Sequence, residues 1–268
     1  TAGTLFLMWI GELISEKGLG NGVSLIIFAG IAAGIPSSLQ QELFTFTADR
    51  IPAYLAFLAV SLLVIAGVVI ISEGQRNIPV SYAKRIRGMR MYGGVSTHLP
   101  LRVNQAGVIP IIFAVSIVLF PGLIGSFLAG VPNPYVQSLS QFLIQLFNNQ
   151  WLYGIVYFLM VFVFTYFYTA VTFDPKSIAD NLQKQGGFIL GIRPGHPTSD
   201  FLQFIINRIT LAGGLFLGIV AVLPLIVRPI FNIQALALGG TALLIVVSVV
   251  LETMKQIDSQ LVMREYDE

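Results

Sequence analysis

Long apolar runs alternate with polar segments along most of this chain, and their length predicts helices that cross a membrane. Five runs of roughly membrane-spanning length cover residues 51–72, 105–127, 151–173, 209–227 and 238–254. A helix rises about 1.5 Å per residue, so about 20 apolar residues cross the hydrocarbon core, where the backbone has to bond internally. The run 22–36 is shorter and predicts a marginal or broken span. The segment 4–14 is shorter still, and is typical of the end of a helix whose start is missing.

The composition agrees with a membrane protein. Hydrophobic residues make up 55% of the chain and charged residues only 10%, whereas charged residues are about a quarter of a soluble globular domain. The chain has no cysteine, which excludes disulfides, thiolate metal sites and cysteine nucleophiles. We therefore expect an all-α polytopic membrane protein, with residues 1–268 forming a single membrane domain. Since the chain begins at Thr1 without a signal-like segment, we expect a fragment or a processed form.

The distribution of charge predicts the orientation of the helices. Most basic residues fall in two loops, 73–103 and 174–208, while the segment 128–150 has no charge. Short basic loops stay in the cytoplasm. The pattern thus predicts a multi-pass membrane protein with both basic loops and the C-terminus on the cytoplasmic side.

The two basic loops carry their own structural signals. The stretch VSYAKRIRGMRMYGG alternates apolar and basic positions, which favours a hairpin or ribbon projecting into water. In the second loop, Asp174 followed by Pro175 predicts the start of a short helix over 178–185. The following GFILGIRPGHP, rich in glycine and proline, predicts an extended tip. Such length favours a docking surface for an acidic or nucleic-acid partner over simple anchoring to lipid headgroups, although the charge alone fits either.

Signals for catalysis or cofactor binding are weak. GLGNG at residues 18–22 lacks the preceding strand and the following Lys-Ser/Thr of a nucleotide loop, so we interpret it as a turn between helices. His98 and His196 are each predicted to lie in a proline-flanked loop, without a second ligand at metal-binding spacing. We expect no cofactor, no metal and no enzymatic activity.

The spans also lack charge in their central turns, which weighs against a proton- or sodium-coupled carrier. Three of them contain possible breaks. Pro110 and Pro224 are expected to kink their helices, and Gly239-Gly240 opens the last run. Such breaks are common in membrane helices for packing alone, but they act as hinges where they flank a movable seam.

Four long segments resemble the bacterial SecY family, the channel subunits of the Sec protein translocon. They are FLMWIGELISEKGLGNGVSLIIFAGI, YAKRIRGMRMYGGVSTHLPLRVNQAGVIPIIFA, FDPKSIADNLQKQGGFILGIRPG and LGGTALLIVVSVVLETMKQ. The resemblance covers essentially the whole chain in unbroken order. It implies the second, C-terminal half of an inverted-repeat clamshell, from the end of helix four to helix ten, around an hourglass pore.

The resemblance implies a pore ring of bulky aliphatic side chains at Ile27, Ile112 and Ile245, with Val23 one turn before Ile27. Such a ring excludes ions because it is narrow and apolar, and it yields to a passing chain because its side chains rotate aside. Without the resemblance, these residues would be interpreted as ordinary packing positions in membrane helices.

The resemblance further implies a lateral gate and a docking surface. The gate wall contains Pro110, Ser116 and Phe120, and its neighbour is the run 151–173. The basic loops resemble those that receive the SecA motor ATPase or the ribosome. Arg193 in GIRPG is the first candidate for docking, and the other candidates are Lys84, Arg85, Arg87 and Arg90.

The function implied is that of a passive protein-conducting channel, which passes unfolded polypeptides across the membrane and releases membrane segments sideways into lipid. The implied partners are SecE- and SecG-type small membrane subunits, SecA, the ribosome, signal sequences, translocating polypeptides, lipid and the missing N-terminal half. A secondary transporter of a small solute is the alternative, since such proteins also use broken helices and inverted repeats. An intramembrane enzyme is disfavoured, because it would need titratable pairs or metal ligands inside the spans.

Overall fold

The computed structural model describes residues 1–18, 20–44, 47, 51–82, 85–87, 90–92, 96–131, 133–231 and 240–265. The chain divides into two compact units, one formed by Thr1–Ile70 with Ile219–Glu268 and the other by Ile71–Gly218. The boundaries fall inside two helices, α3 (Ile51–Glu73) and α8 (His196–Phe231). Each unit is described by itself.

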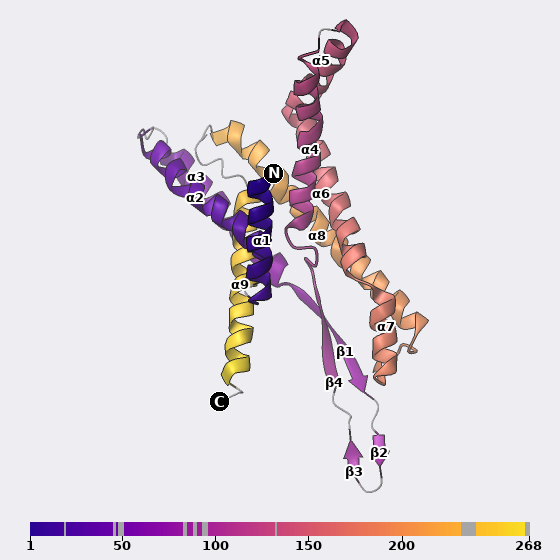
Figure 1. The fold of residues 1–268 in the computed structure, drawn as a ribbon. Helices are drawn as coiled ribbons and strands as arrows, with labels where there is room; N and C mark the ends of the chain where they lie inside the picture. Colours follow the sequence, from indigo (N-terminus) through magenta and orange to yellow (C-terminus); the bar gives the residue numbers. More distant parts are fainter. Residues whose placement is uncertain are drawn as a thin grey trace. The chain divides into compact units, whose positions relative to one another are not determined.

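The described residues of the first unit form helices and the short segments that connect them. Besides most of α3 and the end of α8, it contains α1 (Ala2–Glu16), α2 (Gly22–Phe44) and α9 (Gly240–Glu265). Helix α2 packs against both α1 and α9 (Figure 1). It extends eight residues beyond the predicted end at Pro36, because a proline in a membrane helix removes one hydrogen bond without stopping the helix.

The contact between α1 and α2 depends on two glycines. A β-carbon on Gly22 would collide with the carbonyl oxygen of Gly11, and one on Gly11 would lie 3.2 Å from a methyl group of Val23. The backbones therefore approach more closely than any larger residue allows, as small residues permit in membrane helix pairs. The Ser15 hydroxyl accepts a hydrogen bond of 2.9 Å from the Gly22 amide, which satisfies a free donor at the start of α2.

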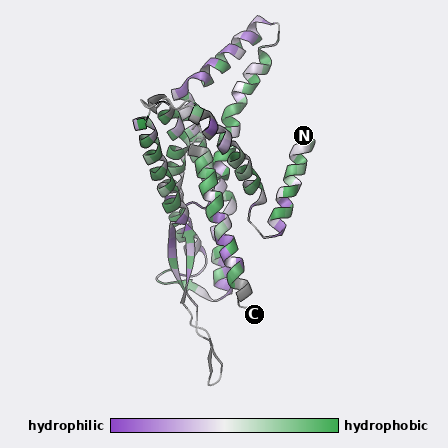
Figure 2. Ribbon diagram, turned by 90° about the vertical axis from the view of Figure 1, so that its left-hand side faces the viewer, coloured by the Kyte–Doolittle hydropathy of each residue, from purple (hydrophilic) through white to green (hydrophobic). Residues whose placement is uncertain are grey.

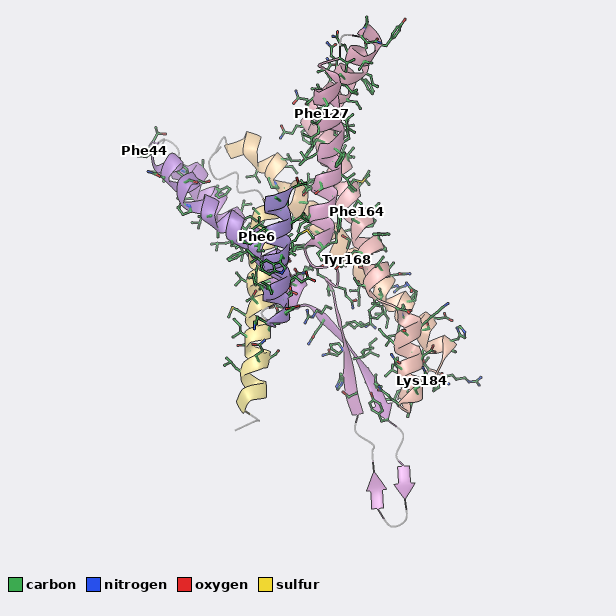
Figure 3. The ribbon with its side chains drawn as sticks, viewed as in Figure 1. Phe6, Phe44, Phe127, Phe164, Tyr168 and Lys184 are labelled. Atoms are coloured by element: carbon green, nitrogen blue, oxygen red, sulfur yellow. The ribbon has the colours of Figure 1, made fainter. Side chains whose placement is uncertain are left out.

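The second unit combines membrane-length helices with a small sheet. Its helices are α4 (Ile109–Leu128), α5 (Pro134–Asn148), α6 (Gln150–Thr172), α7 (Pro175–Lys184) and the first part of α8. Helix α4 packs along α6, where the rings of Phe113 and Phe164 stack with their centroids 6.1 Å apart (Figure 3). Helices α6 and α8 meet through glycines, since β-carbons on Gly214 and Gly218 would lie 3.2 Å and 2.7 Å from the rings of Phe162 and Phe158.

The loop after α3 forms a long antiparallel ribbon, which confirms the predicted hairpin. Strand β1 (Gln75–Tyr82) pairs with β4 (Ser96–Arg102), and β5 (Gly187–Ile189) adds to the other edge of β1. Beyond them, β2 (Arg85–Arg87) pairs with β3 (Arg90–Tyr92) as a separate two-stranded sheet. Figure 2 shows the paired strands in mixed colours, whereas most of the helical segments are coloured hydrophobic.

The three-stranded sheet has a hydrophobic core of its own, which it shares with the first turns of α8. The core residues are Ile78, Val80, Leu101, Ile189, Leu202, Ile205 and Ile206, all buried. Helix α7 adds the half-buried Ile178 and Leu182. We call the three-stranded sheet, α7 and residues 190–208 the loop lobe. The predicted short helix after Pro175 is confirmed as α7, with the Asp174 carboxylate accepting a hydrogen bond of 3.0 Å from the Lys176 amide.

Within the part of the chain that the structure describes, four helices are long and apolar enough to cross a membrane: α3, α4, α6 and α8. This supports the predicted class of a helical membrane protein. Helix α9 is apolar only in its first half, and the apolar part of α2 is a shorter segment, Gly22–Ser38.

Two predictions about individual residues are wrong. Pro110 does not kink a helix, because α4 begins at Ile109 and Pro110 occupies its first turn, where no hydrogen bond from its nitrogen is needed. His196 is not in a loop but begins α8, and His98 lies in β4. Helix α8 starts well before the apolar run that begins at residue 209. Its first turns are amphipathic and bury Leu202, Ile205 and Ile206 in the loop lobe.

The close contact of Gly11 and Gly22 predicts a stability effect. Gly22→Ala is expected to cost about 1–3 kcal/mol, since the added methyl group forces α1 and α2 apart, and to lower the apparent unfolding temperature of the purified full-length protein. Gly30→Ala, in the same helix, is the matched control, because its β-carbon would meet nothing within 4 Å. Equal unfolding temperatures for the two variants would contradict the packing argument.

Candidate functional site

The predicted pore-ring residues lie on three helices that belong to two different units. Val23 and Ile27 are on α2 and Ile245 is on α9, within one unit, whereas Ile112 is on α4 in the other. Ile245 is buried, Ile27 and Ile112 are half-buried, and Val23 is exposed. Because α2 and α9 pack together, Val23, Ile27 and Ile245 lie on helices that contact each other within one unit. The convergence of Ile112 with the others stays a prediction.

The helix that carries Ile112 has one covered face and one open face. Ile111, Ala114 and Val118 are buried, and so is Gly125 near the end of α4. Ser116 and Phe120 follow Ile112 at intervals of four residues, so the three residues lie along one side of the helix. Ser116 and Phe120 are both exposed. We call Ile112, Ser116 and Phe120 the open stripe of α4. Pro110, the remaining predicted gate residue, is fully buried at the start of the helix.

The open stripe is suited to an apolar surrounding even though it contains a serine. The Ser116 hydroxyl donates a hydrogen bond of 2.7 Å to the carbonyl oxygen of Ile112, one turn earlier. A hydroxyl satisfied by its own helix costs little in hydrocarbon. Neither α4 nor α6 contains a charged residue. The stripe can therefore face lipid or an apolar helix without leaving a polar group unpaired.

Of the predicted docking residues, Arg193 lies on the loop lobe, whereas Arg85, Arg87 and Arg90 belong to the separate two-stranded sheet. Arg85 and Arg87 belong to β2 and Arg90 to β3, but their side chains, like the whole of Lys84, are outside the described residues. Arg193 is exposed in the loop between β5 and α8. Lys184 is exposed at the end of α7 (Figure 3).

The backbone of the Arg193 loop is held in a defined conformation. Gly191 and Gly195 adopt positive φ angles of 83° and 100°, which favour glycine. The buried Thr198 hydroxyl donates a hydrogen bond of 2.9 Å to the carbonyl oxygen of Arg193. The amides of Thr198 and Ser199 both donate to the carbonyl oxygen of Gly195. The loop thus presents the Arg193 side chain from a fixed backbone rather than from a flexible tip.

Not every basic residue of the lobe is equally available for docking. The Arg208 guanidinium lies 4.3 Å from the centre of the Phe204 ring, a cation–π contact on the surface of α8. Lys176 is exposed on the first turn of α7. Among the residues that the structure describes, no group of three His, Asp or Glu side chains is placed to hold a metal ion.

The turn at residues 18–22 has partners that the sequence reasoning did not identify. Residues of this turn join α1 to α2, as predicted, and Gly18 and Gly20 have positive φ angles of 77° and 106°. The Gln260 amide on α9 donates a hydrogen bond of 2.6 Å to the carbonyl oxygen of Gly18. A β-carbon on Gly20 would lie 2.7 Å from the side-chain oxygen of Gln256. The turn is therefore bonded to Gln260 of α9 and lies close to Gln256, rather than being shaped for a phosphate.

A signal for this contact was present in the sequence. Gln256 and Gln260 are four residues apart, so they lie on one face of a helix. Gly18, the partner of Gln260, is however 242 residues away along the chain. The spacing of the glutamines can indicate a polar contact but not its partner. Likewise, no sequence motif indicates that Thr198 bonds to the Arg193 loop.

Comparison with known proteins agrees with this arrangement. The SecY family model matches residues 1–254. The chain is 47% identical over 274 residues to the protein translocase subunit SecY of Mycobacterium tuberculosis, covering all of this chain and 61% of that protein. The corresponding subunit of Halalkalibacterium halodurans is 47% identical, with 99% of this chain and 63% of the relative covered. That of Thermotoga maritima is 43% identical, with 99% and 59% covered.

Solved structures show the same fold. A structure described as that of the SecY protein, whose plug domain stabilises the closed translocation channel, matches 95% of this chain and 63% of its own, with a TM-score of 0.62 and 23% identity. Another, described as a protein conducting channel, has a TM-score of 0.60 and 22% identity, covering 95% of this chain and 62% of its own. The chain spans about three fifths of the length of the curated relatives cited. On the family model and these relatives together, this chain belongs to the SecY family.

Proposed function

We propose that this chain forms the C-terminal part of a protein-conducting channel, through which unfolded polypeptides cross the plasma membrane. The observation that carries the proposal is the open stripe of α4, an apolar, uncharged surface in a chain that belongs to the SecY family. The relatives are named as translocase subunits. A channel of this kind does not hold one particular charged group of a substrate. This agrees with the absence of charged side chains on α4 and α6.

In the proposed mechanism, the chain performs no chemical reaction. Val23, Ile27, Ile112 and Ile245 form an apolar constriction that resists ions by being narrow and dry. The open stripe, with Ser116 and Phe120, faces the missing N-terminal half and parts from it to release membrane segments into lipid. Its exposure within this chain supports that role, because a surface that must separate cannot be permanently buried against α6.

The proposed energy source is a partner on the cytoplasmic side. The loop lobe, with Arg193 at its fixed loop, receives SecA or the ribosome, and small membrane subunits of the SecE and SecG type bind elsewhere. Two features support a docking role. The lobe has its own hydrophobic core, so it can bear force, and the Arg193 side chain is exposed on a defined backbone. The proposal places both basic loops and the C-terminus in the cytoplasm.

The general test is transport by the full-length protein. Translocation of a secretory protein into proteoliposomes containing the complete channel should require this chain. Replacing it with a truncated form that ends before α4 should abolish transport. Uptake of a small solute with no protein translocation would support the transporter alternative instead.

A charge reversal tests the docking surface. Arg193→Glu is expected to weaken motor or ribosome binding about tenfold or more, the effect expected when one partner of an interfacial charge pair is inverted, with unchanged membrane insertion. Lys176→Glu is the matched control, because it makes the same change in net charge on another exposed position of the lobe. Equal loss of binding in both variants would show a general charge effect and contradict a specific role for Arg193.

A second variant tests whether the backbone of the Arg193 loop matters. Thr198→Val keeps the shape of the buried side chain but removes the hydrogen bond to the Arg193 carbonyl, at a cost of about 0.5–1.5 kcal/mol. We expect partner binding to weaken by less than in Arg193→Glu. Thr198→Ser, which keeps the hydroxyl, should bind normally. If the valine and serine variants bind alike, the hydrogen bond does not position Arg193.

A polar substitution tests the pore ring. Ile245→Asn is expected to raise ion leak through the resting full-length channel, because a polar group in an apolar constriction favours wetting. Val250→Asn is the control, since this residue of the same helix is exposed, on a face turned away from Ile245. Conductance would be measured in planar bilayers. A leak in the control as large as in the test variant would remove the basis for placing Ile245 in the pore.

A further inference from the structure

The uncharged segment between α4 and α6 is not an irregular loop but contains a well-anchored helix, α5. The Asn133 side chain begins this helix by accepting a hydrogen bond of 3.0 Å from the Tyr135 amide, and Pro134 fixes its first turn. Asn149 ends the helix and at once begins α6, where it accepts a hydrogen bond of 3.2 Å from the Trp151 amide. Capping residues at both ends thus define where α5 lies in the chain.

Helix α5 is also fastened along one side to α4. The buried Ser140 hydroxyl donates a hydrogen bond of 2.7 Å to the carbonyl oxygen of Gly125. A β-carbon on Gly125 would lie 3.0 Å from Ile144 and 3.3 Å from the carbonyl oxygen of Ser140, so the two helices touch at this glycine. A segment held by two caps, a buried hydrogen bond and a glycine contact has a fixed orientation in its unit.

A second side of α5 carries large apolar side chains that nothing in the described chain covers. Tyr135, Leu139 and Phe142 are 87%, 52% and 59% exposed. Their spacing of four and three residues places them on one stripe of the helix. Gln137 and Gln141 lie on the other side of the helix and are also exposed, whereas the exposed Ser138 lies beside Phe142. The upper end of Figure 2 shows this mixture of hydrophobic and hydrophilic residues on α5.

The neighbourhood of the stripe indicates what covers it. Helix α5 joins the ends of two membrane-length helices, and these ends carry exposed aromatic residues. Phe127, close to the end of α4, is 82% exposed (Figure 3), and Trp151, at the start of α6, is 78% exposed. Tyrosine and tryptophan are enriched where hydrocarbon meets headgroups. The exposed aromatic residues at these helix ends favour a membrane interface at the depth of the stripe.

We propose that α5 is an interfacial helix, with Tyr135, Leu139 and Phe142 inserted into the headgroup–acyl boundary of the lipid bilayer at the end where α4 stops and α6 starts. An amphipathic helix of this kind lies along the membrane surface with its apolar face buried a few ångströms deep. Because the segment 128–150 contains no charged residue, the attachment depends on apolar burial and not on anionic lipid. This inference goes beyond the proposed transport function and does not rest on it.

This placement of α5 fixes the depth in the membrane of the C-terminal end of α4. Through Ser140 and Gly125, the position of α5 in the interface is transmitted to the last turns of α4. The open stripe of α4 begins about three and a half turns before that contact. The end of the helix is thus restrained by lipid while its open face stays available to a partner.

Fluorescent labels on single cysteines test this proposal, and the chain's lack of native cysteine makes the labelling specific within it. In the full-length complex, made free of other reactive cysteines, Leu139→Cys and Phe142→Cys report on the stripe. Gln137→Cys and Gln141→Cys are the matched controls on the same helix. All four side chains are exposed, so the substitutions leave the packing with α4 intact. The labelled complexes are placed in vesicles of phosphatidylethanolamine and phosphatidylglycerol that contain a lipid with a nitroxide near the headgroup.

We expect labels at positions 139 and 142 to be quenched several-fold more by the nitroxide lipid than labels at 137 and 141, and the reverse order with aqueous iodide. Replacing phosphatidylglycerol with phosphatidylcholine should leave the pattern unchanged. Iodide quenching that is equal at all four positions would place the stripe in water and overturn the proposal. Protection of 139 and 142 from both quenchers would show that a protein surface covers them, and would overturn it as well.

Discussion

The structure depends first on the need of every backbone amide and carbonyl in hydrocarbon to find a partner within its own segment. This constraint explains why α3, α4, α6 and the apolar part of α8 are continuous helices, although they contain glycines and prolines that would interrupt a helix in water. It also explains where irregular structure occurs. The positive-φ glycines at 18, 20, 107, 186, 191 and 195 all lie between helices or strands, where water or side chains can complete the bonding.

Under that constraint, helices in lipid cannot be held together by the hydrophobic effect, and the close contacts observed are made by small residues. Gly22 lies against the carbonyl of Gly11, Gly218 against the ring of Phe158, and Gly125 against Ser140 and Ile144. The loop lobe follows the opposite rule. It buries Ile78, Leu101 and Leu202 in a compact core, as a soluble domain does.

The sequence predicted the parts of the fold that depend on local composition. The length of the apolar runs located most of the membrane helices, and the alternation of apolar and basic residues located the ribbon of β1 and β4. Both patterns can be recognised because they repeat within one element. Contacts between distant segments could not be predicted in this way. Gln260 and Gly18, or Ser140 and Gly125, are paired by tertiary packing that leaves no period in the sequence. The prediction that Pro110 kinks a helix is wrong because the apolar run begins before α4 does, so that Pro110 lies in the first turn of the helix and not in its interior. The candidate ring residues came from the family resemblance, since an isoleucine facing a pore has the same local pattern as one facing a helix.

Helix α8 shows how the two environments are joined. Its first turns contribute Leu202, Ile205 and Ile206 to the core of the loop lobe, and its next turns place Gly214 and Gly218 against Phe162 and Phe158 of α6. Between these contacts, the Tyr166 hydroxyl donates a hydrogen bond of 3.2 Å to the carbonyl oxygen of Asn207. A helix is stiff over a few turns, so a displacement of the lobe that keeps this core intact has to move the α8 surface that packs on α6. The same residues that fold the lobe therefore provide a rigid mechanical path from the Arg193 loop into the membrane helices. No flexible linker lies between Thr198, which holds that loop, and Gly218, which contacts α6.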